Sequence, residues 1–236
     1  MSRQPLGRPL YALGLVALGI LDLIYRDTVM WKVLPRTAPA PAVLAMVSGV
    51  LLIAVGAGLL APRYRVEATR VLVAFLLIWD VVIGIPPVVT SPTVEVTWLI
   101  LGMMTIVLVA AWILTGRAHL RAARTIVGLC LIPVGLSHFF YLHTTIDLVP
   151  TWMPVRAFWA YLVGAAHIAA GLGILLGVLP RLAAMLEAGM LMSFAILVWV
   201  QRVVVSPGVH FNWTELLGTW AIGAAVWVVA DATKTP

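Results

Sequence analysis

The chain is a succession of long apolar stretches separated by short polar links. Each stretch approaches the roughly 20 residues that an α-helix needs to cross about 30 Å of bilayer hydrocarbon. The apolar windows run approximately from Leu10 to Tyr25, Ala42 to Ala61, Val71 to Pro86, Val96 to Thr115, Thr125 to Leu142, Phe158 to Val178, Leu182 to Val205 and Trp213 to Val229. The pattern therefore predicts an all-α membrane protein with eight transmembrane helices.

The apolar pattern also repeats within the chain. The segment "GVLLIAVGAGLL", Gly49 to Leu60, aligns without gaps with "GAAHIAAGLGIL", Gly164 to Leu175, which lies 115 residues later. Each repeat holds an even number of predicted helices, so both copies enter the membrane in the same orientation. We expect two four-helix bundles related as parallel repeats, over residues 1–118 and 119–236.

Composition and charge agree with a membrane protein and assign a side to its loops. Of 236 residues, 63% are hydrophobic and 10% are charged, against about 25% charged in soluble domains. One side of the eight-helix arrangement holds ten basic residues, namely Arg3, Arg8, Arg63, Arg65, Arg70, Arg117, Arg121, Arg124, Arg181 and Lys234. The other side holds five, namely Arg26, Lys32, Arg36, Arg156 and Arg202.

This asymmetry predicts the orientation, because basic loops remain in the cytoplasm. We expect a multi-pass protein of the plasma (inner) membrane with both termini cytoplasmic and the lipid bilayer as its surroundings. The net charge of +6 then reflects membrane topology and not a nucleic-acid partner. The N-terminal segment, interrupted by Asp22, is interpreted as an uncleaved first helix.

We single out four ionisable residues inside the predicted spans, where exposure to lipid costs about 2.5 to 3.5 kcal/mol on the lenient insertion scale. They are His138, His167, Asp22 and Asp80. His167 lies three residues after Gly164 and four before Gly171, so it shares the face of a small-residue stripe that packs against another helix.

The depths of these residues bear on whether they can meet. At a rise of about 1.5 Å per residue, His138 lies about 21 Å from the cytoplasmic end of its helix and His167 about 16 Å from the outer end. Asp22 has the depth of His138, and Asp80 is near the midplane. We expect His138, His167 and Asp22 to line one polar cavity; the alternative is that each residue only hydrogen-bonds a neighbouring helix.

The outer link between the fifth and sixth predicted helices adds further candidates for a ligand pocket. They are His143, Asp147, Trp152 and Arg156. Trp31, Trp152 and Trp159 are expected in an aromatic belt at the membrane surface, and His210 is expected to be solvated. No metal site is predicted. Haem is not expected, because the sequence lacks an attachment motif and four histidines paired across two helices, and because His138 and His143 are five residues apart and cannot share one helical face.

Part of the chain resembles a known family. The stretch "VPTWMP", followed by "YLVGAAHIAAGLGILLGVLPR", is similar to the DoxX-like family of small four-helix membrane proteins, most clearly over Gly128 to Val200. "GVLLIAVGAGLLAPRYR" in the first half is similar more weakly, so the chain looks like a tandem fusion of two such units. The resemblance implies membrane redox chemistry, including subunits that pass electrons from sulfur compounds to quinone.

Three functions follow from these observations, and whether the protein is an enzyme stays open. The first is a quinone-linked redox subunit, in which a protonated histidine donates to a quinone carbonyl and a redox partner subunit carries the electrons. Histidine suits this role because it titrates near neutral pH. The second is a carrier or receptor for a small amphiphile or lipid. The third is a structural partner of a membrane complex.

Overall fold

A computed structural model describes residues 5–30, 32–33 and 40–233. Its elements are α1 (Gly7–Tyr25), β1 (Thr28–Val29), β2 (Lys32–Val33), α2 (Pro41–Leu60), α3 (Arg65–Trp79), η1 (Asp80–Gly84), α4 (Ile85–Thr90), α5 (Glu95–Leu114), α6 (Leu120–Phe140), α7 (Leu142–Leu148), α8 (Arg156–Leu176), α9 (Pro180–Phe194), η2 (Ala195–Val200), α10 (Gln201–Val205) and α11 (His210–Ala232). The protein is all-α apart from the short β1–β2 hairpin, and its described residues contain eight helices able to span a membrane.

The eight predicted helices are all present. The third and seventh spans are composite, because α3, η1 and α4 run on without a break from Arg65 to Thr90, and α9, η2 and α10 from Pro180 to Val205. The third span starts earlier than the predicted Val71, since its first turns carry charged residues that lower the hydropathy without ending the helix. Its π-helical segment η1 precedes Pro86 and Pro87, which cannot donate to the backbone ladder.

Close contacts between glycines join α1 to α2 and α6 to α8. A Cβ added at Gly19 would lie 2.6 Å from the carbonyl oxygen of Gly49, and one added at Gly135 would lie 2.7 Å from that of Gly164. Such distances are too short for any side chain, so the backbones touch directly. The two pairs occupy matching places in the predicted repeat, although the division into two repeated units stays a prediction.

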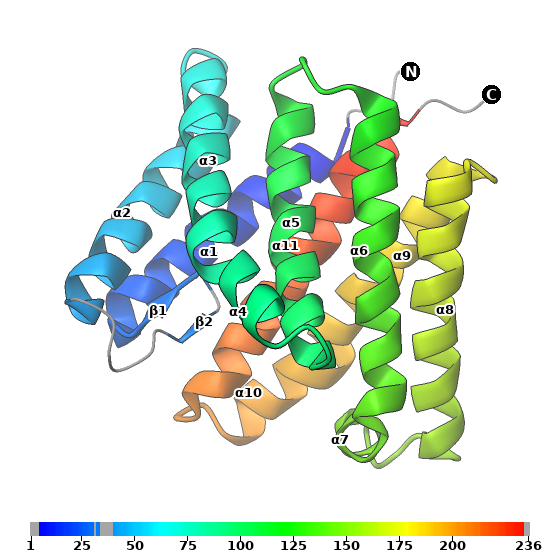
Figure 1. The fold of residues 1–236 in the computed structure, drawn as a ribbon. Helices are drawn as coiled ribbons and strands as arrows, with labels where there is room; N and C mark the ends of the chain where they lie inside the picture. The colour runs from blue at the N-terminus through cyan, green and yellow to red at the C-terminus, as the bar shows by residue number, and fades with distance from the viewer. Residues whose placement is uncertain (1–4, 31, 34–39, 234–236) are drawn as a thin grey trace.

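The last span lies in the middle of the bundle. α11 packs against α1, α5 and α9, and Figure 1 shows it behind α5 and α6 in the interior of the molecule. It is the most buried of the eight spans, with 61% of its apolar window covered. The helix α11 therefore connects the first half of the chain to the second.

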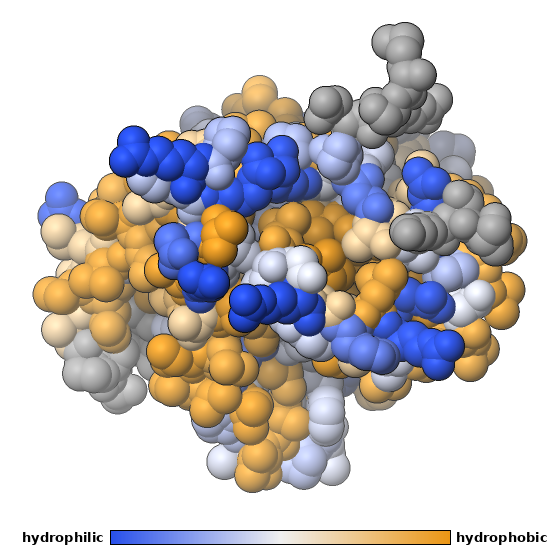
Figure 2. All heavy atoms as spheres, turned by 90° about the horizontal axis from the view of Figure 1, so that it is seen from above, coloured by the Kyte–Doolittle hydropathy of each residue, from blue (hydrophilic) through white to orange (hydrophobic). Residues whose placement is uncertain are grey.

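The start of α1 and the end of α11 lie at one end of the bundle, beside the α2–α3, α5–α6 and α8–α9 links (Figure 1). Figure 2 looks onto this end and shows hydrophilic residues gathered across its middle with hydrophobic residues around them. This distribution fits a bundle whose sides face lipid and whose ends face water. It agrees with the predicted placement of both termini on one side, while the cytoplasmic identity of that side stays a prediction.

Candidate functional site

The centre of the second half holds a buried pair of ionisable side chains. His167 on α8 and Glu187 on α9 face each other, with Nδ1 of the histidine 2.6 Å from Oε1 of the glutamate. Their side chains are 1% and 0% exposed. The second carboxylate oxygen, Oε2, is buried without a hydrogen-bond partner in the described part of the chain. A charge at this place is tolerable only because the two groups are paired.

His138 on α6 lies next to this pair. Its ring centroid is 5.0 Å from that of His167, with the ring planes tilted by 47°. Nδ1 of His138 is 3.0 Å from the carbonyl oxygen of Val134 one turn earlier. Gly164 makes room for this arrangement, since a Cβ there would be 2.8 Å from the Cβ of His138. The two histidines, whose depths made contact geometrically possible, therefore lie side by side, and their role in a ligand pocket stays a prediction.

A cavity of about 490 Å³ opens beside His138. Its walls come from α6, α7, α8, α9 and η2, and the π-helical η2 contributes a run of three residues. The lining consists of His138, Thr145, Leu148, Val149, Pro150, Met153, Trp159, Ala160, Leu162, Val163, Ala166, Met190, Ser193, Phe194, Leu197, Val198 and Trp199. Apolar and aromatic side chains dominate, and His138 is the one titratable residue among them. Such a cavity suits an amphiphile with a single polar head.

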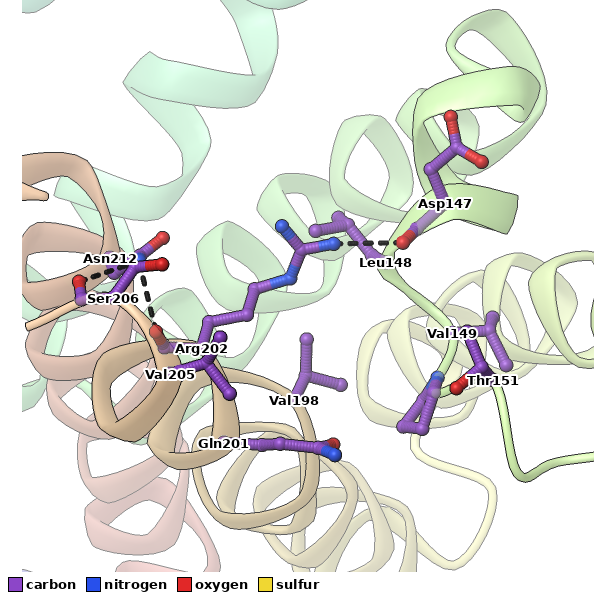
Figure 3. A pocket seen from close by; sticks show the side chains of 11 residues that line it. Asp147, Leu148, Val149, Thr151, Val198, Gln201, Arg202, Val205, Ser206 and Asn212 are labelled. Atoms are coloured by element: carbon purple, nitrogen blue, oxygen red, sulfur yellow. Dashed lines mark hydrogen bonds between the residues drawn. The ribbon is translucent and has the colours of Figure 1, made fainter.

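A smaller and more polar pocket adjoins the apolar cavity towards the end of the bundle where α7 lies. It measures about 280 Å³ and is drawn in Figure 3. The two spaces share the lining residues Leu148, Val149, Pro150 and Val198. Across this pocket the Arg202 guanidinium donates to the carbonyl oxygen of Asp147 at 2.8 Å, while the Asp147 carboxylate points away (Figure 3). Arg202 thereby links α10 to the C-terminal end of α7.

Arginine side chains help to hold the segment from α7 to Val149 in place. None of the α7 residues is buried. Arg156, at the start of α8, donates to the carbonyl oxygens of Ile146 and Val149, and it lies 3.6 Å from the Asp147 carboxylate. Thus Arg156 and Asp147, two of the predicted candidates, fix the wall of the cavity and do not line its interior beside the histidines.

The structure does not bring the predicted aspartates to the histidines. Asp22 on α1 accepts hydrogen bonds from the hydroxyl of Ser48 at 2.7 Å and from the backbone of Met30 at 3.0 Å, so it ties α1 to α2 and to the hairpin. Asp80 accepts from the hydroxyl of Thr105 at 3.0 Å. Both are buried within the first half, and their contacts are those of the alternative weighed above, hydrogen bonding between helices.

The remaining candidates lie in different surroundings. His143 and Trp152 are exposed, and Trp159 is partly inside, where it lines the cavity. Trp31 is outside the described residues. His210, expected to be solvated, instead stacks on Tyr25 with ring centroids 3.5 Å apart. Among the described residues, no group of three or more His, Cys, Asp or Glu side chains is placed to hold a metal ion.

Sequence reasoning missed Glu187 and Trp199. Glu187 lies within the seventh apolar window, so the cost of an ionisable side chain in lipid that selected His167 also applies to it. Its pairing with His167 has no sequence signal, because the two residues are on different helices. Trp199 belongs to η2, and nothing in the hydropathy pattern distinguishes a π-helical turn from an α-helical one.

Comparison with known proteins identifies a family domain in the second half of the chain. The DoxX family model matches residues 119–201, a range that extends from the residue before α6 to the first residue of α10. No curated protein and no solved structure matches the chain. The matched range includes the His167–Glu187 pair and every residue that lines the larger cavity.

Proposed function

We propose that the second half of the protein binds a membrane-soluble quinol or quinone and exchanges protons with it. Residues 119–201 are a DoxX family domain, and they lie within a protein of eight candidate membrane spans. The observation that carries the proposal is the apolar cavity of about 490 Å³ with His138 in its wall and the buried His167–Glu187 pair behind His138.

The size and chemistry of the cavity support a quinone-type ligand. Its volume lies within the roughly 300 to 1,000 Å³ of ordinary small-molecule sites. Aromatic residues Trp159, Phe194 and Trp199 line it and offer faces for a planar ring. His138 supplies a polar contact for a ring oxygen, and the aliphatic lining suits a prenyl chain.

Proton exchange with the ligand accounts for a titratable side chain, His138, in the wall of an apolar cavity. Oxidation of a quinol to a quinone releases two electrons and two protons, and His138 is placed to accept these protons one at a time. The positive charge formed on His138 is then close to the His167–Glu187 pair, whose carboxylate offsets it. The two electrons pass to a redox partner protein, which is the partner expected from the family resemblance.

A test of this function needs a cavity that can be closed without touching the histidines. Ala166 lines the cavity and is partly exposed to it, so Ala166→Phe should fill space that the ligand would occupy. Ala54 on α2 is exposed on the outside of the bundle, and Ala54→Phe serves as the matched control. The parent and both variants are purified in lipid nanodiscs, extracted with organic solvent and assayed for quinone by mass spectrometry.

The expected result is quinone above the level of empty nanodiscs in the parent and in Ala54→Phe, with loss of most of it in Ala166→Phe. Equal quinone in all three samples would mean that the cavity is not the site. Retention of a different amphiphile, lost on Ala166→Phe, would favour a carrier or receptor. No retained molecule in the parent, even after quinone is added, would leave the structural-partner function.

A further inference from the structure

The hydrogen bonds around His138 fix which ring nitrogen carries its hydrogen. Nδ1 lies 3.0 Å from the carbonyl oxygen of Val134 and 3.5 Å from the hydroxyl oxygen of Ser137. A carbonyl oxygen can only accept. The single hydrogen of Ser137 is already donated to Val134, at 2.7 Å. Both neighbours of Nδ1 are therefore acceptors, and Nδ1 must be the protonated nitrogen.

The other ring nitrogen, Nε2, is then a lone-pair acceptor. It makes no hydrogen bond to the described residues, and His138 lines the cavity. A second proton on this ring would place a charge among apolar side chains, with the imidazole of His167 as its nearest titratable neighbour. The resting histidine thus offers an acceptor to a ligand.

Most of the other polar side chains of the lining have no hydrogen left to offer. Thr145 donates its hydroxyl hydrogen to Tyr141 and Ser193 donates to Met190, both to backbone carbonyl oxygens. The indole N–H of Trp159 donates to the carbonyl oxygen of Pro154. The indole N–H of Trp199 is the remaining side-chain donor of the lining. A ligand oxygen that bonds Nε2 of His138 must bring its own hydrogen, because Nε2 can only accept; Trp199 is the one described side chain of the lining with a hydrogen left for a carbonyl oxygen.

We infer that the cavity selects the hydroxyl form of its ligand, the quinol over the quinone, through a hydrogen bond from a ligand hydroxyl to Nε2 of His138. This inference rests on the proposed function and specifies its substrate form. It reverses the direction of the hydrogen bond predicted from the sequence, in which a protonated histidine donates to a quinone carbonyl. The sequence alone does not reveal the contacts of His138 with Val134 and Ser137, which decide that direction.

The expected preference follows from the cost of leaving a polar group unpaired. A quinone carbonyl or a methyl ether places an acceptor against the acceptor Nε2, and the loss of one such hydrogen bond weakens binding about tenfold. A tenfold preference for the reduced form raises the midpoint potential of the bound two-electron couple by about 30 mV. The bound quinol is consequently a weaker reductant than the free one.

The experiment compares three probes with the same short prenyl tail: a benzoquinol, its benzoquinone and its di-O-methyl ether. Retention of each probe on protein-containing nanodiscs is titrated against empty nanodiscs under anaerobic conditions, for the parent, His138→Leu and His143→Leu. His143 is exposed on α7 and does not line the cavity, so His143→Leu is the matched control. Ala166→Phe reports whether retention occurs in the cavity.

The parent and His143→Leu should retain the quinol about tenfold more tightly than either analogue, and His138→Leu should bind all three probes alike. Quinone or ether binding as tight as quinol binding, yet abolished by Ala166→Phe, would overturn the inference and leave the proposed function standing. Failure of the parent to bind any probe would overturn both. Should His138→Leu fail to fold, the three-probe comparison in the parent still decides.

Discussion

The candidate site contains two buried ionisable side chains, His167 and Glu187, each of which needs the other as its hydrogen-bond partner. His167 and Glu187 are both fully covered, so neither can be solvated if its partner is lost. The sequence was sufficient to place His167 inside the bundle, because it shares a helical face with Gly164 and Gly171. It was not sufficient to identify the partner, since contacts between helices depend on the packing of distant segments.

The first prediction concerns how the stability of the protein depends on each member of the His167–Glu187 pair. His167→Leu should lower the stability of the bundle by roughly 3 to 5 kcal/mol, because it leaves the Glu187 carboxylate buried and unpaired. The double variant His167→Leu with Glu187→Leu should recover most of this loss, since it removes both desolvated groups. Thermal unfolding in detergent measures the difference. A single variant as stable as the parent would show that the carboxylate has another partner.

The second prediction concerns the glycine that makes room for His138. Gly164→Ala should destabilise the protein by about 1 to 3 kcal/mol through overpacking, since the new methyl group would lie 3.0 Å from the carbonyl oxygen of Gly135 and 2.8 Å from the Cβ of His138. Gly189→Ala on α9 is the matched control, because nothing lies within 4 Å of a Cβ at that position.

In the same unfolding assay, Gly189→Ala should be neutral or stabilising, as expected for a change to the better helix former. Equal losses in the two variants would contradict the close approach of α6 and α8. Retained quinol should decrease in Gly164→Ala alone, because displacement of His138 moves Nε2 relative to the cavity.

At the scale of elements, α7 is the least anchored part of the site. It contributes Thr145 and Leu148 to the cavity wall, yet none of its residues is buried. The described contacts that hold it include those from Arg156 and Arg202, which approach its C-terminal end from α8 and α10. Local opening of such a segment costs less than unfolding of the bundle.

The third prediction follows from this attachment. Arg202→Met should speed amide hydrogen exchange over residues 142–149 roughly tenfold, through the loss of one charge-assisted hydrogen bond, while exchange in α6 and α8 stays unchanged. Arg121→Met, at the exposed start of α6, is the control at the other end of the bundle. Unchanged exchange in α7 would show that Arg202 does not hold it. Mass spectrometry of peptic fragments provides the measurement.

The elements themselves were largely predictable, and their irregularities were not. Eight apolar windows became eight spans because the bilayer requires every spanning backbone group to be paired within its own helix. The π-helical segments η1 and η2 were not predicted, since hydropathy does not record how a helix is wound. Because η2 supplies Trp199 to the cavity, the missing prediction of π-helical segments affected the description of the site more than that of the fold.

At the scale of the whole molecule, the fourth prediction concerns orientation. Links on the end that carries both termini should be cytoplasmic, because this end has the excess of basic residues. Reporter fusions after Pro92, Thr145 and Gly208 should therefore be active outside, and one after Arg121 should be active inside. An inside signal at Thr145 would refute the assigned orientation, and an inside signal at Thr145 together with an outside signal at Pro92 would also refute the parallel arrangement of the two halves.

The packing of the described helices bears on the predicted repeat, which stays a prediction. α1 pairs with α2 through glycines as α6 pairs with α8, and α1 also packs on α11 as α6 packs on α5. These parallels agree with the predicted division at residue 118. The polar chemistry does not follow them, because Asp22 ties helices together in the first half whereas His138 opens onto a cavity in the second.

The central position of α11 has a consequence for biogenesis. This helix is the last of the eight described spans, so the ribosome makes it after the other seven. Until it enters the membrane, α1 and α9 lack the neighbour that fills the space between them, although the glycine contacts of α1 with α2 and of α6 with α8 can already form. The order of synthesis therefore makes insertion of the final span the step that closes the bundle.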